Sequence, residues 1–557
     1  MELEKLCQRA WGIRTPENRY GVTYSMLKDS LLLIVSLLFL ISMLAMLSDK
    51  LRISYPIFLV IAGLGISLIP GVPQIELNPN IVFVIFLPPL LYSAAWLTSW
   101  RDFWRLRRPI GLLAFGLVLC TAFAVAWFSN WLIPNFPLAL GFLLGGIISP
   151  PDAIAATSVL QNLRVPKQVV AILEGESLVN DASSLIVFRF ALAAIFTGKF
   201  LLWKAGVDFF LVIIMGILIG LAIAHIVYAI HRWLPTTSSI DTAITLISPY
   251  LMYIGAEHFH YSGVLAVVSG GLFLSYRSHD ILSYDSRLQA VSVWNVIIFL
   301  LNGVVFILIG LQLPGVVRGL GEYSLRAAIG YGAAISVVTI LVRLLWVIPG
   351  AYLPRVLSKR IRKREVRPPW KSVFLIGWSG MRGVVSLASA LAVPITLSNG
   401  QSFPHRNMIL CITFCVILST LVLQGLTLPL LIRWLKIDVQ ENEEEERLAI
   451  RLRLANLIVD HMSTHYEEES QTIEPFSRLK SRYERMAEIT DKQLKKEEGG
   501  GMGPGFLPRY RRLLLELVSL QRQELSRMRH ENLFSEETLR KKETELDLEE
   551  ARFRRLG

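Results

Sequence analysis

The feature that most constrains this 557-residue chain is a series of apolar stretches that follow one another between residues 27 and 435. A helix of about 20 apolar residues is long enough to cross the hydrocarbon core of a bilayer. Charged residues make up only 18% of the chain, whereas they make up roughly a quarter of a soluble protein. The sequence therefore predicts an all-α polytopic membrane protein rather than a soluble one.

The apolar stretches predict about 13 transmembrane helices, separated by short polar loops. We expect them at 27–47, 54–70, 80–98, 109–132, 137–160, 168–196, 205–230, 241–258, 261–276, 290–313, 325–353, 372–394 and 406–435. The eighth and ninth are short, which leaves open whether they are two helices or one broken pair.

Three regions follow from this pattern. Residues 1–26 form an N-terminal segment without the pattern of a cleaved signal peptide. Residues 27–435 form the transmembrane domain, and residues 436–557 form a soluble helical tail rich in Glu, Lys and Arg, interrupted by the flexible stretch 499–505. The tail has the amphipathic pattern of packed helices, and a regulatory or dimer-supporting role for it stays open.

Basic residues alternate from loop to loop. The segment from Arg355 to Lys371 carries eight of them, whereas the segment from Pro70 to Asn80 carries none. Because basic loops stay in the cytoplasm, we expect a multi-pass protein of the cell membrane with its tail inside and its N-terminus outside. These loops account for much of the net charge of +12, so we expect no nucleic-acid partner.

Two predicted helices are interrupted halfway by Gly, Ser or Pro. In each, one charge lies at the interruption, Asp152 in 137–160 and Arg382 in 372–394. The two helices are seven spans apart, so they cross the membrane in opposite directions. This pattern is typical of an inverted repeat with two discontinuous helices that meet near the midplane. Two glycine-rich packing helices are the alternative.

The run from Glu174 to Asp181, with the sequence EGESLVND, places three carboxylates and an amide in an apolar helix. A carboxylate at membrane depth costs several kcal/mol and marks a functional site by default. On a helix, Ser177 and Asp181 share one face, and Glu176 and Asn180 share the next. These groups need a partner, and a cation is the simplest one.

Oxygen ligands of mixed charge suit a hard cation such as Na+. We expect Asp181, Asp152 and Ser177 to hold it, with Asn180 nearby. Burial favours the protonated form of a carboxylate, whereas a bound cation favours the ionised form. Asp181 would therefore bind a proton or a cation in turn, and exchange would need no covalent step, no enzyme activity and no cofactor.

Other intramembrane charges need partners. We expect Glu176 to form a structural ion pair with Arg382, because an unpaired charge is costly there. Glu257 lies near a helix end and has a structural or accessory role. The partners of Arg189 and Arg343 stay open at this point, and the cysteines fit packing better than a metal pair.

The sequence also resembles a known family, the sodium–proton exchangers of the monovalent cation:proton antiporter-1 family. The motifs that carry the resemblance, in chain order, are 87–91 (LPPLL), 149–156 (SPPDAIAA), 174–181 (EGESLVND), 256–257 (AE) with 262–263 (SG), and 380–383 (GMRG). They cover nearly the whole transmembrane domain.

The resemblance implies an inverted-repeat homodimer that works by alternating access. It implies that Asp181 carries the ion and the proton, that Asp152 and Ser177 assist, and that Glu176 and Arg382 pair. Asn180 stands where an electrogenic sister family has a second aspartate, which implies electroneutral exchange of one Na+ for one H+. The chain departs from the pattern at Ser93, where many members have an acidic residue, and Asp152 is followed by Ala153 rather than Pro.

The sequence thus predicts a secondary active antiporter that exchanges Na+, or Li+, for H+ across the bilayer. The alternatives are K+/H+ exchange on the same scaffold and a membrane sensor that signals through its tail.

Overall fold

The computed structural model describes most of the chain. The described ranges are 19–51, 53–70, 82–160, 163, 165–197, 202–320, 324–364, 367–397, 400–436, 442–495, 506–531 and 536–554. Most of the predicted N-terminal segment, the loop 71–80 and the flexible stretch 499–505 lie outside these ranges.

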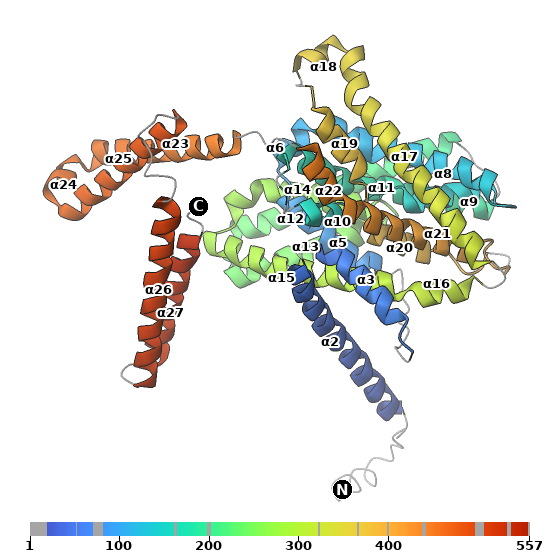
Figure 1. Cartoon of the computed structure of the whole chain (residues 1–557), viewed down its shortest axis with the longest axis horizontal. Coiled ribbons are helices and arrows are strands. Elements are labelled where there is room, and N and C mark those ends of the chain that lie inside the picture. The colour runs from blue at the N-terminus through green and yellow to red at the C-terminus, as the bar shows by residue number, and fades with distance from the viewer. Residues whose placement is uncertain are drawn as a thin grey trace, which may run out of the picture. The chain divides into compact units, whose positions relative to one another are not determined.

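Within these ranges the chain is helical, and its only extended pairing is a bridge between Thr396 and Ser402. Figure 1 shows the helices in chain order. In the first unit they are α2 (Arg19–Leu51), α3 (Tyr55–Ser67), the π-helical turn η1 (Val82–Phe86), α5 (Leu87–Leu97), α6 (Trp100–Arg105), α7 (Arg107–Gly111), η2 (Leu112–Leu117), α8 (Val118–Leu132), α9 (Leu138–Ile148), α10 (Ala153–Leu160), α11 (Lys167–Thr197), α12 (Leu202–Trp233), α13 (Ser238–His258), α14 (Gly263–Ile281), α15 (Tyr284–Leu311), α16 (Leu313–Gly319), α17 (Leu325–Leu357), α18 (Lys359–Arg364), α19 (Trp370–Trp378), α20 (Val384–Leu391), α21 (Arg406–Ser419), η3 (Thr420–Gln424) and α22 (Gly425–Leu435).

Contacts divide the chain into two units, Met1–Val439 and Gln440–Gly557. The second unit contains α23 (Asn442–His465), α24 (Glu467–Thr472), α25 (Glu474–Leu494), α26 (Phe506–His530) and α27 (Glu536–Arg554). Here α23 packs on α25, and α26 packs on α27. Arg522 of α26 forms ion pairs with Asp547 and Glu550 of α27, which fixes the register of that helical hairpin.

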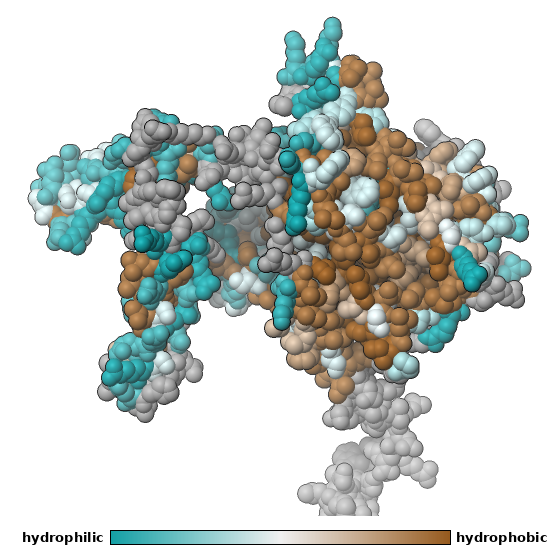
Figure 2. Space-filling view, in the orientation of Figure 1, coloured by the Kyte–Doolittle hydropathy of each residue, from teal (hydrophilic) through white to brown (hydrophobic). Residues whose placement is uncertain are grey.

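Within the described residues, each predicted transmembrane stretch coincides with one helix or with two or three consecutive helical segments. Within the described residues, eight helical stretches are long and apolar enough to cross a bilayer, and α3 and the η1–α5 segment are shorter apolar helices. Figure 2 shows hydrophobic side chains over most of the visible face of the first unit, Met1–Val439. The apolar surface and the helix lengths together give a polytopic helical membrane fold. The stretches 241–258 and 261–276 form separate helices, α13 and α14, joined by a turn in which His260 has a φ of 61°.

Both predicted interruptions are present. The first separates α9, which ends at Ile148, from α10, which begins at Ala153. The second separates α19, which ends at Trp378, from α20, which begins at Val384. The two breaks contact each other, because the backbone N–H of Asp152 donates to the carbonyl of Met381 at 2.7 Å.

Glycines allow the close approach of two helix pairs. A Cβ on Gly63 or Gly310 would run into the backbone of the facing helix, so α3 and α15 touch backbone to backbone. The same holds for Gly141 and Gly145 of α9 against α8. These contacts make α3–α15 and α8–α9 two tightly packed pairs.

Candidate functional site

A cavity of about 230 Å³ lies beside the first break. Its wall comes from α3, α5, α10, α11, α15, α20 and the two breaks. It contains the polar residues Tyr55, Ser93, Asp152, Thr157, Ser158, Glu174, Ser177, Asp181, Asn302 and Ser386. A polar cavity of this size has room for several waters and a cation. It brings together Asp152, Ser177 and Asp181, the three residues that the sequence predicts as ion ligands.

Asp152 joins the two interrupted helices. Its Oδ1 accepts the N–H of Ile154 at 2.8 Å, so the side chain caps the N-terminus of α10. Its Oδ2 lies against Gly383, at the N-terminus of α20. Unpaired N–H groups and the helix dipoles at these two ends favour a negative charge there. This capping role could not be read from the sequence.

Gly383 is the residue that makes room for this arrangement. A Cβ at Gly383 would overlap Oδ2 of Asp152. The Asp152 carboxylate of the first break can therefore take its place only because the second break has a glycine at position 383.

Arg382 is buried at the second break, with 0% of its surface exposed. Its Nε donates to the carbonyl of Ile148 at 3.1 Å, and its Nη1 donates to the carbonyl of Gly380. Its backbone N–H donates to Oγ1 of Thr420 at 3.1 Å. Because Ile148 is the last residue of α9, the guanidinium lies at a helix C-terminus, where a positive charge is favoured.

The predicted pairing of Glu176 with Arg382 is wrong. Glu176 forms a two-point ion pair with Arg343 of α17, with Nη1–Oε1 at 2.5 Å and Nη2–Oε2 at 2.8 Å. The side chains are 1% and 0% exposed. Arg343 takes this place because its planar guanidinium meets both carboxylate oxygens, while Arg382 is engaged with the carbonyls at the break. The presence of Arg343 in an apolar stretch indicated a buried partner. Sequence spacing alone does not show which carboxylate that partner is.

Asp181 lies on α11 with 7% of its surface exposed. Its carboxylate accepts no hydrogen bond from the residues that the structure describes, and it is close enough to Asp152 for the two charges to repel. Glu174, Ser177 and Asp181 follow one another along the cavity wall at helical spacing. Asp181 is thus a buried, unpaired carboxylate that faces a polar cavity.

Ser177 and Asn180 hold the first break against α11. Oγ of Ser177 accepts the N–H of Ala153 at 3.3 Å, and Nδ2 of Asn180 donates to the carbonyl of Pro151 at 3.0 Å. Ser177 also lines the cavity, whereas Asn180 is absent from its wall. The Asn180 amide therefore provides a donor for a carbonyl that the break leaves without a helical partner. Irregular backbone at membrane depth is tolerated only where its polar groups find such partners.

The remaining predicted residues lie as follows. Ser93 lines the cavity, and its hydroxyl donates to the carbonyl of Leu90 at 2.8 Å. Glu257 lies away from the cavity and forms a two-point pair with Arg189, at 2.8 and 2.9 Å. Glu257 also accepts the N–H of Gly263 at 3.2 Å, so it joins α11, α13 and α14. The pair settles the open question of Arg189.

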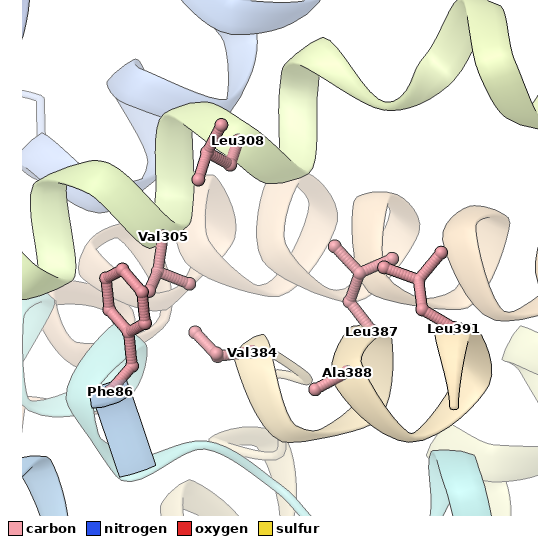
Figure 3. A pocket seen from close by; sticks show the side chains of 7 residues that line it. All are labelled: Phe86, Val305, Leu308, Val384, Leu387, Ala388 and Leu391. Atoms are coloured by element: carbon pink, nitrogen blue, oxygen red, sulfur yellow. The ribbon is translucent and has the colours of Figure 1, made fainter. Parts of the chain in front are cut away.

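A second, much smaller cavity of about 10 Å³ lies on the other side of Val384. Its wall is entirely apolar (Figure 3): Phe86, Val305, Leu308, Val384, Leu387, Ala388 and Leu391. It is at the lower limit of the volume that one water needs, and it offers that water no polar partner. Val384 belongs to the walls of both cavities, so the two cavities adjoin at this side chain.

No group of three or more His, Cys, Asp or Glu side chains with metal-binding geometry occurs among the described residues. The candidate site instead offers two carboxylates, a hydroxyl and backbone. Such a set suits a weakly held monovalent ion better than a tightly bound transition metal.

Comparisons with known proteins agree with this geometry. The family described as "Sodium/hydrogen exchanger, transmembrane" matches residues 34–434. The chain is 36% identical over 388 residues to a sodium, potassium, lithium and rubidium/H+ antiporter of Bacillus subtilis, a match that covers 68% of this chain and 58% of that protein. It is 30% identical over 537 residues to an uncharacterized Na+/H+ exchanger of Mycobacterium tuberculosis, covering 93% of this chain and 95% of that protein.

The match spans less than two thirds of the Bacillus subtilis relative's length. Among solved structures, the chain resembles the sodium proton antiporter MjNhaP1 of Methanocaldococcus jannaschii, with a TM-score of 0.58 and 20% identity over 73% of this chain and 98% of that one. This likeness supports the antiporter fold. The family match and the Mycobacterium relative together establish that the chain belongs to the family of transmembrane sodium/hydrogen exchangers.

Proposed function

We propose that the chain is a secondary active antiporter that exchanges Na+ for H+, with the cation and the proton competing for Asp181. The observation that carries the proposal is the buried Asp181 carboxylate, which faces a polar cavity without a hydrogen-bond donor and close to a second carboxylate. Such a group is stable at membrane depth only with a proton or a cation bound. Because the carboxylate binds either the proton or the cation but not both, this competition is sufficient to couple the movement of one to the movement of the other.

Na+ would be held by Asp181, Ser177 and Asp152, with water completing its oxygen shell. Two helix N-termini lie beside Asp152 and favour a negative charge there. The side-chain amide of Asn180 is neutral, and its N–H donates to the carbonyl of Pro151. Asp181 is the carboxylate of α11 beside Asp152, and Glu174 is two turns away on the same wall; with Asp181 as the carrier, we infer electroneutral exchange of one Na+ for one H+. Ser93 and Glu257 have accessory roles.

The cavity would be open to the cytoplasm in this conformation. Tyr55, Leu97 and Ser158 on its wall lie at the ends of apolar stretches that lead into basic loops, and basic loops stay in the cytoplasm. The small apolar cavity beyond Val384 would close the outer side. Rocking of one helix group against the other would open that side and close the inner one.

The larger architecture follows from the same assignment. We infer 13 crossings in an inverted repeat, with the two broken helices crossing at the contact between Asp152 and Met381. We further infer a homodimer in the cell membrane, with a transmembrane domain at 27–435, a cytoplasmic tail at 436–557 and the N-terminus outside. The adjoining breaks and the alternation of basic loops support this arrangement.

K+/H+ exchange on the same site is the second candidate, because the name of the Bacillus subtilis relative includes potassium, lithium and rubidium. A ring of oxygen ligands in a roomy cavity does not by itself select one of these ions.

The test is exchange in proteoliposomes loaded with a pH-sensitive dye, with Na+, Li+ or K+ added in turn. We expect a proton flux with Na+ in the parent protein and none in Asp181→Asn. Equal flux in Asp181→Asn, or no flux with any cation in a folded parent, would overturn the proposal. A response to K+ that exceeds the response to Na+ would favour the second candidate.

A further inference from the structure

The short segment that joins α5 to α7 concentrates positive charge at the membrane surface. It carries four arginines, Arg101, Arg105, Arg107 and Arg108, and one aspartate, Asp102. Only residues 99–108 separate the transmembrane stretches 80–98 and 109–132, so the segment lies where the bilayer meets water. With basic loops inside, as proposed above, it faces the cytoplasmic leaflet, which carries anionic lipid headgroups.

Aromatic rings cover one side of α6. Trp100 stacks on Phe103 and on Trp104, with ring centroids 6.2 and 5.6 Å apart. Both tryptophans remain exposed, at 39% and 54%. Tryptophan is enriched at membrane surfaces, because its ring is apolar and its N–H still reaches polar groups. Helical spacing puts Arg101 and Arg105 on a different side of α6, as in a helix that lies in the interface.

Arg107 is held in place against these rings. Its guanidinium carbon lies 4.8 Å from the centroid of the Trp104 ring, and its Nη1 donates to the carbonyl of Trp104 at 2.8 Å. An aromatic ring attracts a cation above its face, so the two contacts together fix the guanidinium. Among the described residues, Nε and Nη2 of Arg107 donate to no other group, and the residue is exposed. These N–H groups are available to a ligand.

The neighbouring arginines add positive charge around Arg107. Arg101 is exposed and forms no ion pair with the residues that the structure describes. Arg105 pairs with Asp102 at 3.2 Å, but the two side chains are 61% and 44% exposed, so this pair is weak. A guanidinium can give a phosphate two parallel N–H bonds. A fixed guanidinium among other arginines, beside exposed tryptophans, therefore fits the headgroup phosphate of an anionic lipid.

The same segment touches the carrier helix. α6 packs on α11 and on α14, and in α7, which follows directly, Ile110 fills the space beside Gly175 of α11. Gly175 belongs to the run 174–181 that contains the carrier aspartate. About one turn after Ile110, the carbonyl of Ala114 accepts the hydroxyl of Ser183 of α11. A ligand that holds α6 at the membrane surface therefore acts on a part of the protein that supports α11.

We propose that residues 100–108 bind the headgroup phosphate of an anionic phospholipid of the cytoplasmic leaflet, and that the bound lipid supports α11 through α6 and α7. Arg107 holds the phosphate, Arg101 adds positive charge, and the rings of Trp100 and Trp104 lie against the lipid chains. The binding site is independent of the antiport function, whereas its effect on exchange rests on that function.

The test of the site is the quenching of tryptophan fluorescence by lipids brominated in their acyl chains. The full-length protein is placed in vesicles of phosphatidylcholine and phosphatidylglycerol, and one lipid at a time is brominated. Subtracting the signal of Trp100→Phe/Trp104→Phe, in each background, isolates the rings of α6. One basic residue near an anionic surface contributes about a factor of five in binding. We expect these rings to prefer phosphatidylglycerol at least about fivefold in the parent and to show no preference in Arg101→Gln/Arg107→Gln.

Trp131 provides the matched control for the rings. It is 75% exposed and lies at the other end of the stretch 109–132, and residues 128–140 contain no Lys or Arg. We expect the signal that Trp131→Phe removes to show no preference between the two lipids, in the parent and in Arg101→Gln/Arg107→Gln alike.

The effect on exchange is measured at saturating Na+ in unbrominated vesicles with and without phosphatidylglycerol. We expect phosphatidylglycerol to raise the maximal rate of the parent about twofold or more, because an anchored α6 gives α11 a fixed support. Arg101→Gln/Arg107→Gln should lose this dependence on the lipid. Arg362→Gln/Lys363→Gln should keep it, because these exposed residues carry the same charge on α18, which packs on α17.

Equal quenching of the α6 rings by the two lipids in the parent would overturn the binding site. A preference that survived in Arg101→Gln/Arg107→Gln would overturn it as well, since other residues would then hold the lipid. A local preference without any effect of phosphatidylglycerol on the rate would overturn the link to α11 alone. Absence of exchange in the parent with every lipid would count against the antiport function and leave the quenching result in force.

Discussion

The backbone N–H of Asp152 donates to the carbonyl oxygen of Met381 at 2.7 Å. Through this bond, and through the contact of Asp152 Oδ2 with Gly383, the two interrupted helices touch each other directly. The breaks are therefore a single structural unit, although more than 200 residues of sequence separate them. Substitutions at one break should act on the other.

Gly383→Ala tests this unit. The new methyl group would overlap Oδ2 of Asp152, and overpacking of this kind costs about 1–3 kcal/mol. We expect exchange to fall at least about tenfold and the unfolding temperature in detergent to drop. Gly330→Ala in α17 is the control, because a Cβ there meets nothing within 4 Å. Full activity in Gly383→Ala would contradict the described contact.

Arg343→Leu tests the buried ion pair. Removing one partner leaves the charge of Glu176 unpaired at membrane depth, which costs about 3–5 kcal/mol. We expect a large fall in the thermal midpoint, measured by fluorescence in detergent, and a smaller fall when Glu176→Leu is added to Arg343→Leu.

Arg189→Leu is the comparison, because the Arg189–Glu257 pair is 46% and 30% exposed. A partly exposed pair of this kind is worth only about 0–1 kcal/mol. The same comparison can be made with Arg382→Leu. If adding Glu176→Leu reduced the fall in the thermal midpoint for Arg382→Leu but not for Arg343→Leu, the observed pairing would be refuted.

Much of this arrangement could be predicted from the sequence. The apolar stretches, the two interruptions and the residues of the cavity wall at Asp152, Ser177 and Asp181 follow from local features such as hydropathy and helical spacing. The partner of Glu176 did not follow, because Arg343 and Arg382 are equally plausible when only sequence is read.

Asn180→Asp tests the role of the amide beside the carrier residue. The substitution replaces the N–H donor to the Pro151 carbonyl by an acceptor, so two oxygens would face each other in a buried place. We expect slower exchange and no gain of charge movement per cycle, measured as exchange with and without an imposed membrane potential. Fast, potential-driven exchange in this variant would show instead that Asn180 serves mainly to keep a second negative charge away.

Cysteine labelling tests which side the polar cavity opens to. In a background without Cys7, Cys120, Cys411 and Cys415, Ser93→Cys lies on the polar cavity and Leu391→Cys on the small apolar one. We expect a membrane-impermeant thiol reagent to modify Ser93→Cys from the cytoplasmic side only, more slowly when Na+ is bound. Leu391→Cys should resist the reagent from both sides in this conformation. Rapid labelling of Leu391→Cys from outside would mean that the small apolar cavity is not closed.

The position of Val384 on the walls of both cavities has an electrical consequence. With the polar cavity open to the cytoplasm as proposed, water in it would carry bulk solution deep into the protein, and the voltage across the membrane would fall mostly over the apolar residues around Val384. Each elementary charge that crosses the full voltage is worth about 2.3 kcal/mol per 100 mV. A displacement of a few side chains around Val384 could therefore expose the bound ion to nearly the whole field, without the ion itself travelling far.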